Sequence, residues 1–145
     1  MRADFILLSE QPLPQQLAWW CEQVAQLWRQ HRTLRVWCSD QIAAEQFDEY
    51  LWQQPVDAFI PHNLCGEGPP GGTPVEICWP QCKQLQPRGV AAHVNLAADI
   101  PLHLKGARFV LDRVPTSEPD KQQARERYKK YRALGFELQT ISPTN

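Results

Sequence analysis

The chain has 145 residues, of which 43% are hydrophobic and 21% are charged, and its formal net charge is −1. These values are typical of one globular domain over residues 1–145, which is long enough to bury a core without disulfides or metals. They exclude a membrane-spanning chain, because no apolar run approaches the required ~18 residues. The apolar run FILL near the N-terminus is too short for a signal peptide, so we expect a cytoplasmic protein.

Strands and helices alternate through the first part of the chain. A short apolar run predicts a buried strand at residues 3–8, and a pair of prolines then introduces a helix that runs to about residue 30. A second strand is expected at residues 34–38. Ser39 and Asp40 are good N-cap residues for a second helix, whose expected inner face consists of Ile42, Phe47 and Leu51.

The second part of the chain supplies most of the remaining strands. A third helix is expected from near Pro119, which suits a first helical turn, to Gly135, which suits the residue just after a helix. The alternation of strands and helices predicts right-handed crossovers and a mainly parallel sheet with helices on both faces, an α/β fold of three layers (α/β/α). The remaining strands are expected at residues 56–60, 75–79, 91–96, 109–114 and 136–141.

A glycine-rich loop invites a comparison with nucleotide-binding folds. The loop reads Gly-Glu-Gly-Pro-Pro-Gly-Gly over residues 66–72. A phosphate cradle needs free backbone N–H groups and usually a following lysine and helix, whereas here two prolines remove donors, Glu67 repels phosphate and a strand follows. We therefore expect a fold that is nucleotide-binding-like but lacks a phosphate loop, and we expect no cofactor.

The five cysteines are expected to be buried or half-buried thiols. Cys78 and Cys82 form a C-x3-C pair, and His62 and Cys65 are conceivable further zinc ligands, but the spacing is not that of a standard zinc site and we expect no metal. His62 and Cys65 could also act as base and nucleophile. A histidine that hydrogen-bonds a turn is the more common arrangement, and nothing else in the sequence favours an enzyme.

The segment KQQARERYKKYR, residues 121–132, carries most of the positive charge. Six of its twelve residues are basic and one is acidic, in a chain whose net charge is −1. Helical spacing gives one stripe on which cations flank an aromatic ring. Such a stripe could be a solvated surface, could bind an acidic peptide, or could bind single-stranded nucleic acid through phosphates and base stacking. The stripe consists of Lys121, Arg125, Tyr128, Lys129 and Arg132.

Trp52 and Phe59 form a second candidate surface. Both are expected near the end of an element, with Pro55 between them. Aromatic residues in such places are typical interface anchors. The alternative is that each ring covers the local core, and the residue types alone leave both interpretations open.

Two long motifs are similar to one known family. Residues 51–80 contain PHNL-x-GEGP-x-GG-x-PVEI-x-WP, and residues 114–139 contain K-x3-RERYK-x-YR-x-x-GF. Both resemble the chi subunit of bacterial DNA polymerase III holoenzyme. Residues 1–50 agree in layout more than in identity, and residues 82–108 match poorly.

The resemblance implies a non-catalytic component of the clamp-loader assembly, active in DNA replication and repair. It implies two partners: the psi subunit, and the acidic C-terminal tail of single-stranded DNA-binding protein, which ends in aspartates and a hydrophobic residue. Lys121, Arg125, Tyr128 and Lys129 match the family's tail-binding residues, and helical geometry adds Arg132. Trp52 and Phe59 match its psi-facing surface, where a repair helicase is a further expected partner. Contact with nucleic acid would then be mainly indirect; direct binding of single strands by the basic helix is the alternative.

Overall fold

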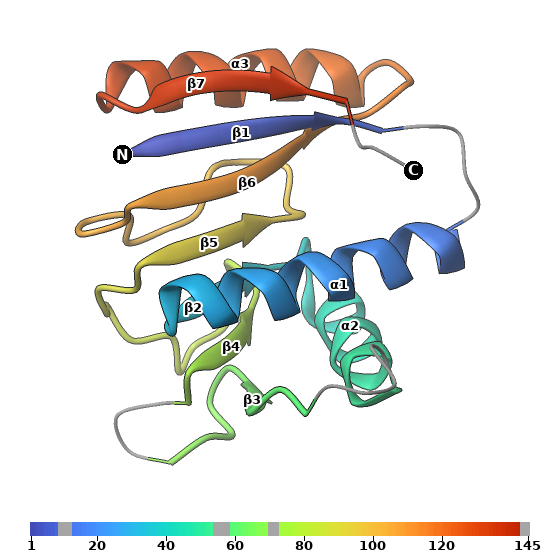
Figure 1. Ribbon diagram of the computed structural model, residues 1–145, viewed down its shortest axis with the longest axis vertical. Coiled ribbons are helices and arrows are strands. Elements are labelled where there is room, and N and C mark those ends of the chain that lie inside the picture. Colours follow the sequence, from blue (N-terminus) through green and yellow to red (C-terminus); the bar gives the residue numbers. More distant parts are fainter. Residues whose placement is uncertain (9–12, 54–58, 70–72, 143–145) are drawn as a thin grey trace.

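A seven-stranded parallel sheet forms the middle of the protein. The computed structural model describes residues 1–8, 13–53, 59–69 and 73–142. All strand pairs are parallel, and the strand order is β3-β4-β2-β5-β6-β1-β7, so β3 and β7 are the two edges (Figure 1). The elements are β1 (Arg2–Leu7), α1 (Leu13–His31), β2 (Leu34–Trp37), α2 (Gln41–Gln53), β3 (His62–Leu64), β4 (Val75–Cys78), β5 (Ala92–Asn95), β6 (Phe109–Val114), α3 (Asp120–Ala133) and β7 (Glu137–Ile141).

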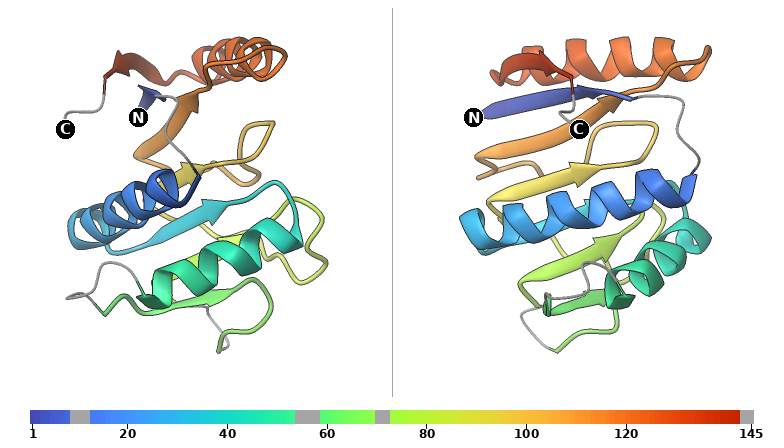
Figure 2. Two further views of the ribbon diagram at one scale, coloured as in Figure 1. Left: turned by 90° about the vertical axis from the view of Figure 1, so that its right-hand side faces the viewer. Right: turned by 45° about the vertical axis from the view of Figure 1, so that its right-hand side comes forward.

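Helices cover both faces of the sheet, which confirms the expected three-layer α/β/α fold. Two of them, α1 and α2, lie together on one face, whereas α3 lies on the other beside β7 (Figures 1 and 2). The chain order explains this, because right-handed crossovers that run in opposite directions along the sheet place their helices on opposite faces. None of the described helices combines the length and apolar character needed to cross a membrane.

Alternation along the strands builds a separate core on each face. Phe109 and Leu111 of β6 pack with the α1 and α2 residues, whereas Val110 between them packs with Phe5 and Tyr131 under α3. Successive side chains of a strand point to opposite faces, so one buried strand serves both cores. A third cluster lies on the α3 side of β2 and β4; no helix supplies its members, which are Trp37, Cys65, Cys78, Cys82 and Ala97.

Most predicted elements are confirmed within one or two residues, and two expectations need correction. Residues 54–58 of the predicted strand at 56–60 lie outside the described residues; Phe59 and Ile60 are not in a strand, and the third strand begins at His62. Ile42 was expected on the inner face of α2 but is 68% exposed, while Ala44, Phe47 and Leu51 are buried. Ile42 lies five and nine positions before Phe47 and Leu51, about 140° and 180° around the helix from them, so its side chain faces away from the core that Ala44 of the same turn contacts.

The predicted ends of the second and third helices are borne out by their hydrogen bonds. The Asp40 carboxylate accepts a hydrogen bond from the N–H of Ala43 at 2.8 Å, as an N-cap residue does. Helix α3 starts directly after Pro119. Gly135 follows its last residues at φ +93°, a left-handed conformation that favours glycine, and donates its N–H to the Arg132 carbonyl.

Candidate functional site

A pocket of about 320 Å³ lies between α3 and the sheet, and it gathers most of the predicted basic stripe. Apart from Phe5 and Ala124, which are buried beneath it, its walls are partly or fully exposed. We call it the α3 pocket. It is lined by Phe5, Val114, Lys121, Ala124, Arg125, Tyr128, Lys129 and Thr140.

Aromatic contact gives the α3 pocket a firm apolar floor. The ring of Phe5, from β1, lies 5.5 Å from the ring of Tyr128 and 5.7 Å from that of Tyr131, measured between centroids. Tyr128 remains 36% exposed, so it forms a wall of the pocket rather than part of the core. The pocket therefore offers an apolar surface large enough for one bulky side chain.

Three cations surround this floor. Arg125 pairs with Glu118 at 3.5 Å and Lys129 pairs with Glu126 at 3.5 Å, both at exposed positions. Exposed pairs of this kind contribute only about 0–1 kcal/mol, so a carboxylate from another molecule can replace either glutamate at little cost. Lys121 forms no ion pair within the described part of the chain. The cations on the rim of the pocket can thus bind negatively charged groups of another molecule.

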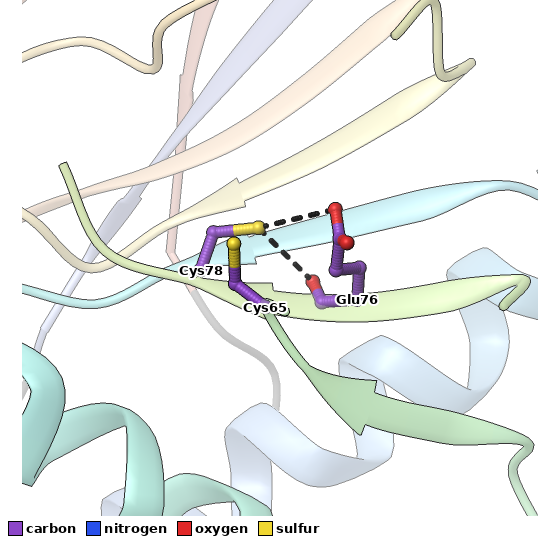
Figure 3. Close-up of side chains that lie close together, drawn as sticks. All are labelled: Cys65, Glu76 and Cys78. Carbon is purple, nitrogen blue, oxygen red and sulfur yellow. Dashed lines mark hydrogen bonds between the residues drawn. The ribbon is translucent and has the colours of Figure 1, made fainter. Parts of the chain in front are cut away.

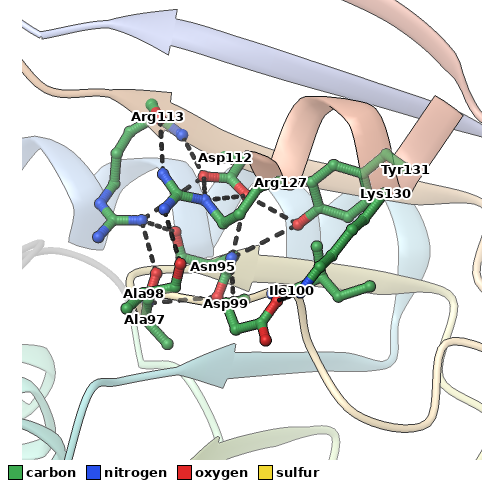
Figure 4. Close-up of polar contacts among 10 residues, drawn as sticks. All are labelled: Asn95, Ala97, Ala98, Asp99, Ile100, Asp112, Arg113, Arg127, Lys130 and Tyr131. Carbon is green, nitrogen blue, oxygen red and sulfur yellow. Dashed lines mark hydrogen bonds and ion pairs between the residues drawn. The ribbon is translucent and has the colours of Figure 1, made fainter. Parts of the chain in front are cut away.

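A buried polar network fixes α3 over the sheet (Figure 4). The Nε of Arg127 donates to both carboxylate oxygens of Asp112, at 3.1 and 3.2 Å, and its other nitrogens donate to the carbonyls of Ala98 and Arg113. The hydroxyl of Tyr131 donates to Asp112 at 2.7 Å. Burial and the adjacent Asp112 raise the pKa of Tyr131, which therefore stays protonated.

The network shows what sequence reasoning missed on this helix. Arg127 was counted with the basic segment, yet it is 1% exposed and neutralised by Asp112. Arg132 is exposed as expected but does not line the α3 pocket. The floor residue Phe5 lies more than a hundred residues upstream, and no local signal in the sequence linked it to α3.

Trp52 and Phe59 come together as an exposed aromatic patch beside β3. Their ring centroids are 6.4 Å apart, and the two residues are 59% and 73% exposed. The sequence left interface anchors and core caps as alternatives, and these exposures favour anchors. We call the pair the aromatic patch.

His62 supports the patch from beneath. Its ring lies 4.5 Å from that of Trp52, its Nδ1 hydrogen-bonds the Ile60 carbonyl at 2.7 Å, and its Nε2 lies 3.3 Å from the Asp48 carboxylate. Burial raises the pKa of Asp48, and the neighbouring His62 offsets part of that rise. His62 thus bonds a turn, as histidines commonly do, and buttresses an exposed tryptophan.

The structure separates His62 from Cys65. His62 pairs with Val75 in the sheet, and Val75 packs with the α1 and α2 core, so His62 is on that face. Cys65 belongs to the cluster on the opposite face, whereas its neighbour Leu64 packs with the α1 and α2 core. The two side chains therefore cannot act together as base and nucleophile.

Cys65 instead meets other thiols and a carboxylate. The ligand atoms of Cys65, Glu76 and Cys78 all lie within 4.8 Å of one another, and the Sγ of Cys82 lies 2.7 Å from that of Cys65. A hydrogen bond from Cys78 lowers the pKa of the Cys65 thiol to about 7, whereas burial raises the pKa of Cys21, in α1, to about 12. All five cysteines are buried, as expected.

Comparison with known proteins relates the chain to one family. Residues 1–139 match the family described as DNA polymerase III chi subunit, HolC. The chain is 42% identical over 122 residues to DNA polymerase III subunit chi of Escherichia coli K12, covering 84% of this chain and 82% of that protein. It is 38% identical over 120 residues to the subunit chi of Haemophilus influenzae, covering 83% and 82%.

The fold extends beyond these relatives. The crystal structure of T4 UvsW superposes with a TM-score of 0.60 at 10% sequence identity, over 97% of this chain and 41% of that one. At this identity the likeness concerns the fold alone.

Proposed function

The chain belongs to the family of DNA polymerase III chi subunits, accessory subunits of the replisome, and from this we propose that it is a non-catalytic adaptor with two partners. One partner is the acidic C-terminal tail of single-stranded DNA-binding protein, and the other is the psi subunit. The family expected from the motifs at residues 51–80 and 114–139 is thereby confirmed, while the two partners are our proposal.

The α3 pocket is the observation that carries the tail-binding part of the proposal. A peptide that ends in aspartates and a hydrophobic residue would place its last side chain against the exposed face of Tyr128, above the floor formed by Phe5. Its carboxylates would pair with Lys121, Arg125 and Lys129, and Arg125 can hold a carboxylate with two parallel hydrogen bonds. Arg132, one turn beyond, would add attraction without contact to the end of the peptide.

Weak and salt-sensitive binding is expected at this pocket. Each exposed ion pair contributes about 0–1 kcal/mol and is screened by salt, so a single tail should bind with micromolar affinity. A tetramer with several tails would gain affinity through multivalency. The contact could then exchange during replication.

The aromatic patch supports the second part of the proposal. Two large exposed rings, one braced by His62, have the character of anchors in a durable apolar interface. We propose that psi covers Trp52 and Phe59. A repair helicase that used the same patch would compete with psi; if Trp52→Ala bound such a helicase normally, this shared use would be disproved.

The decisive experiment is a fluorescence-anisotropy titration with a labelled acidic tail peptide that has a free C-terminal phenylalanine. Arg125→Ala should weaken binding about fivefold to tenfold, and added salt should weaken the wild type. Arg29→Ala is the matched control, because it removes the same charge from an exposed position at the end of α1, on the other face of the sheet.

Unlabelled single-stranded DNA is added as a competitor. It should not displace the peptide. Tight DNA binding without peptide binding would mean that α3 recognises phosphates, and the adaptor proposal would then fail.

A further inference from the structure

Three thiols and a carboxylate lie together on the α3 side of the sheet, at its β3 edge, and Figure 3 shows Cys65, Glu76 and Cys78 of this group. Cys65 directly follows β3, Glu76 and Cys78 lie on β4, and Cys82 lies in the segment after β4. Their positions alternate as strand geometry requires: Glu76 and Cys78 point away from the α1 and α2 core that receives Val75 and Ile77. Cys65, Cys78 and Cys82 were considered from the sequence together with His62, and no metal was expected because of their spacing; the structure brings Glu76 to this group in place of His62.

The distances fit a metal ion. The ligand atoms of Cys65, Glu76 and Cys78 all lie within 4.8 Å of one another, and the Cys82 and Cys65 sulfurs are in contact at 2.7 Å. Ligands around a tetrahedral Zn²⁺, with Zn–S bonds of about 2.3 Å, lie roughly 3.8 Å apart. Cys65, Glu76 and Cys78 are thus already spaced as ligands of one ion, and Cys82, which contacts only Cys65 in this group, would have to turn towards the ion to become the fourth.

The surroundings hold the four side chains in place. Arg35 is buried and donates from Nε to the Glu76 carboxylate at 2.8 Å, and from Nη2 to the Gln86 carbonyl at 2.6 Å. An outer residue that orients a ligating carboxylate in this way is a regular feature of metal sites. The positive charge of Arg35 also offsets part of the negative charge that thiolates would add.

Two tight turns bring Cys65 and Cys82 together. Gly66 has φ +87°, and a Cβ at this position would lie 2.9 Å from the Cβ of Gln84, so only glycine allows the two turns to touch. Backbone hydrogen bonds close the turns, from Glu67 to Leu64 and from Cys82 to Trp79. The thiols are thus positioned by the backbone.

A surface pocket gives access to the cluster. It has a volume of about 350 Å³, and both Cys65 and Cys82 line it, with Gln41, Trp79 and Gln84 among its other walls. Cys78 is fully buried behind them. An ion can therefore enter beside the two outer thiols and reach the inner one.

We propose that Cys65, Glu76, Cys78 and Cys82 form a structural Zn²⁺ site that fastens the short edge strand β3 to the segment after β4. Thiolates with one carboxylate suit Zn²⁺, which needs no redox partner and accepts four-coordinate sites. As each Zn–S bond forms, the thiol proton passes to solvent, so binding releases protons. The ring of His62, on the same strand, contacts that of Trp52, so the ion would also restrict movement beneath the aromatic patch.

The test begins with fully reduced, chelator-treated protein in oxygen-free buffer. Titration with ZnCl₂ should show one equivalent bound, and the melting temperature should rise by about 5–10 °C with zinc at a hundredfold excess over Kd. Titration with CoCl₂ should give the visible and charge-transfer bands of a tetrahedral thiolate site. Failure of the reduced protein to bind either ion would overturn the proposal.

Variants locate the site and separate it from loss of fold. Cys78→Ala should abolish the cobalt bands, and Cys82→Ser, in a turn rather than a strand, should weaken zinc binding at least tenfold with an unchanged circular dichroism spectrum. Cys21→Ala is the matched control, since it removes a buried thiol from α1, and it should bind zinc normally.

Two results would contradict the assignment. Full zinc binding by the double variant Cys65→Ala/Cys78→Ala would place the ion elsewhere. A Cys65–Cys82 disulfide in freshly isolated protein, together with no zinc uptake after reduction, would make the pair a redox couple instead.

Discussion

The two candidate binding surfaces lie at opposite edges of the sheet and are built in opposite ways. At the β7 edge, the α3 pocket is concave, has an apolar floor and carries cations on its rim. Beside β3, at the other edge, the aromatic patch presents two rings that are mostly exposed. As proposed, the α3 pocket would hold its ligand mainly through charge, and the aromatic patch mainly through burial of apolar area.

The difference between the surfaces predicts different kinds of partner contact. Exposed charges give weak, salt-sensitive and rapidly exchanging contacts, whereas buried aromatic anchors give lasting ones. Because β4, β2 and β5 lie between β3 and the strands that line the α3 pocket, one partner need not displace the other. Under the proposed function, the chain would hold one partner durably at β3 while it exchanges the other at α3.

Removal of the anchor beneath α3 should have the largest effect. Arg127→Met leaves the buried Asp112 with only the longer ion pair to Arg113, at 3.5 Å, and we expect this to lower the free energy of unfolding by about 3 kcal/mol. Urea denaturation followed by circular dichroism measures this loss. Arg132→Met is the matched control on the exposed face and should change stability by less than about 0.5 kcal/mol. An equal loss in both variants would show that the network does not fix α3.

Truncation of one aromatic ring should weaken binding at the aromatic patch and leave binding at the α3 pocket unchanged. Trp52→Ala should weaken the proposed psi contact by about 2 kcal/mol or more, because a central aromatic anchor is lost. Because Trp52 is mostly exposed, stability should change little, and tail-peptide binding should not change. Calorimetric titration measures the affinity for psi, and fluorescence anisotropy measures the affinity for the tail peptide. Loss of both activities would mean that the surfaces are coupled.

Acid should lower the free energy of unfolding, because a buried histidine lies on β5, in the middle of the sheet. Burial, together with the nearby Arg35, lowers the pKa of His93 to about 3, and Trp37 donates its indole N–H to the His93 Nδ1 at 3.0 Å. The folded state therefore favours neutral His93. The unfolded chain binds a proton below about pH 6.5, so stability should fall from there towards pH 3, by about 2 kcal/mol at pH 5.

Chemical denaturation at pH 7 and pH 5 measures this dependence. His93→Gln keeps an acceptor for Trp37 but cannot titrate, so its stability should vary less between the two pH values. The same slope in both proteins would assign the acid sensitivity to other groups. Partner binding should accordingly be compared above pH 6.5.

The smallest effect should come from the cation outside the α3 pocket. Arg132→Ala should weaken tail binding by about twofold, through long-range charge alone, whereas Lys121→Ala, on the rim, should weaken it by about fivefold. Anisotropy at low salt has the sensitivity to distinguish them. A larger loss from Arg132→Ala would extend the binding site towards the end of α3.

The sequence by itself determined the elements and the family. Strand and helix periods are fixed by backbone geometry, so the parallel sheet and the cationic stripe of α3 follow from local spacing. Two long motifs identified the family, and their segments contain the aromatic patch and the α3 residues of the pocket, but not its floor residue Phe5. The expectation for Ile42 was wrong because its residue type suggested burial, whereas its spacing from Phe47 and Leu51 places it on the outer side of α2.

Only the tertiary structure decided which residues meet across distant segments. Lys121 and Arg127 are both basic residues of one helix, yet the second is buried because Asp112 of β6 lies beneath it. Phe5 forms the pocket floor because β1 lies between β6 and β7, and the thiols of Cys65 and Cys78 meet because β3 pairs with β4. Periodicity acts over a few residues of one segment, whereas burial and pairing depend on strand order, which no local pattern specifies.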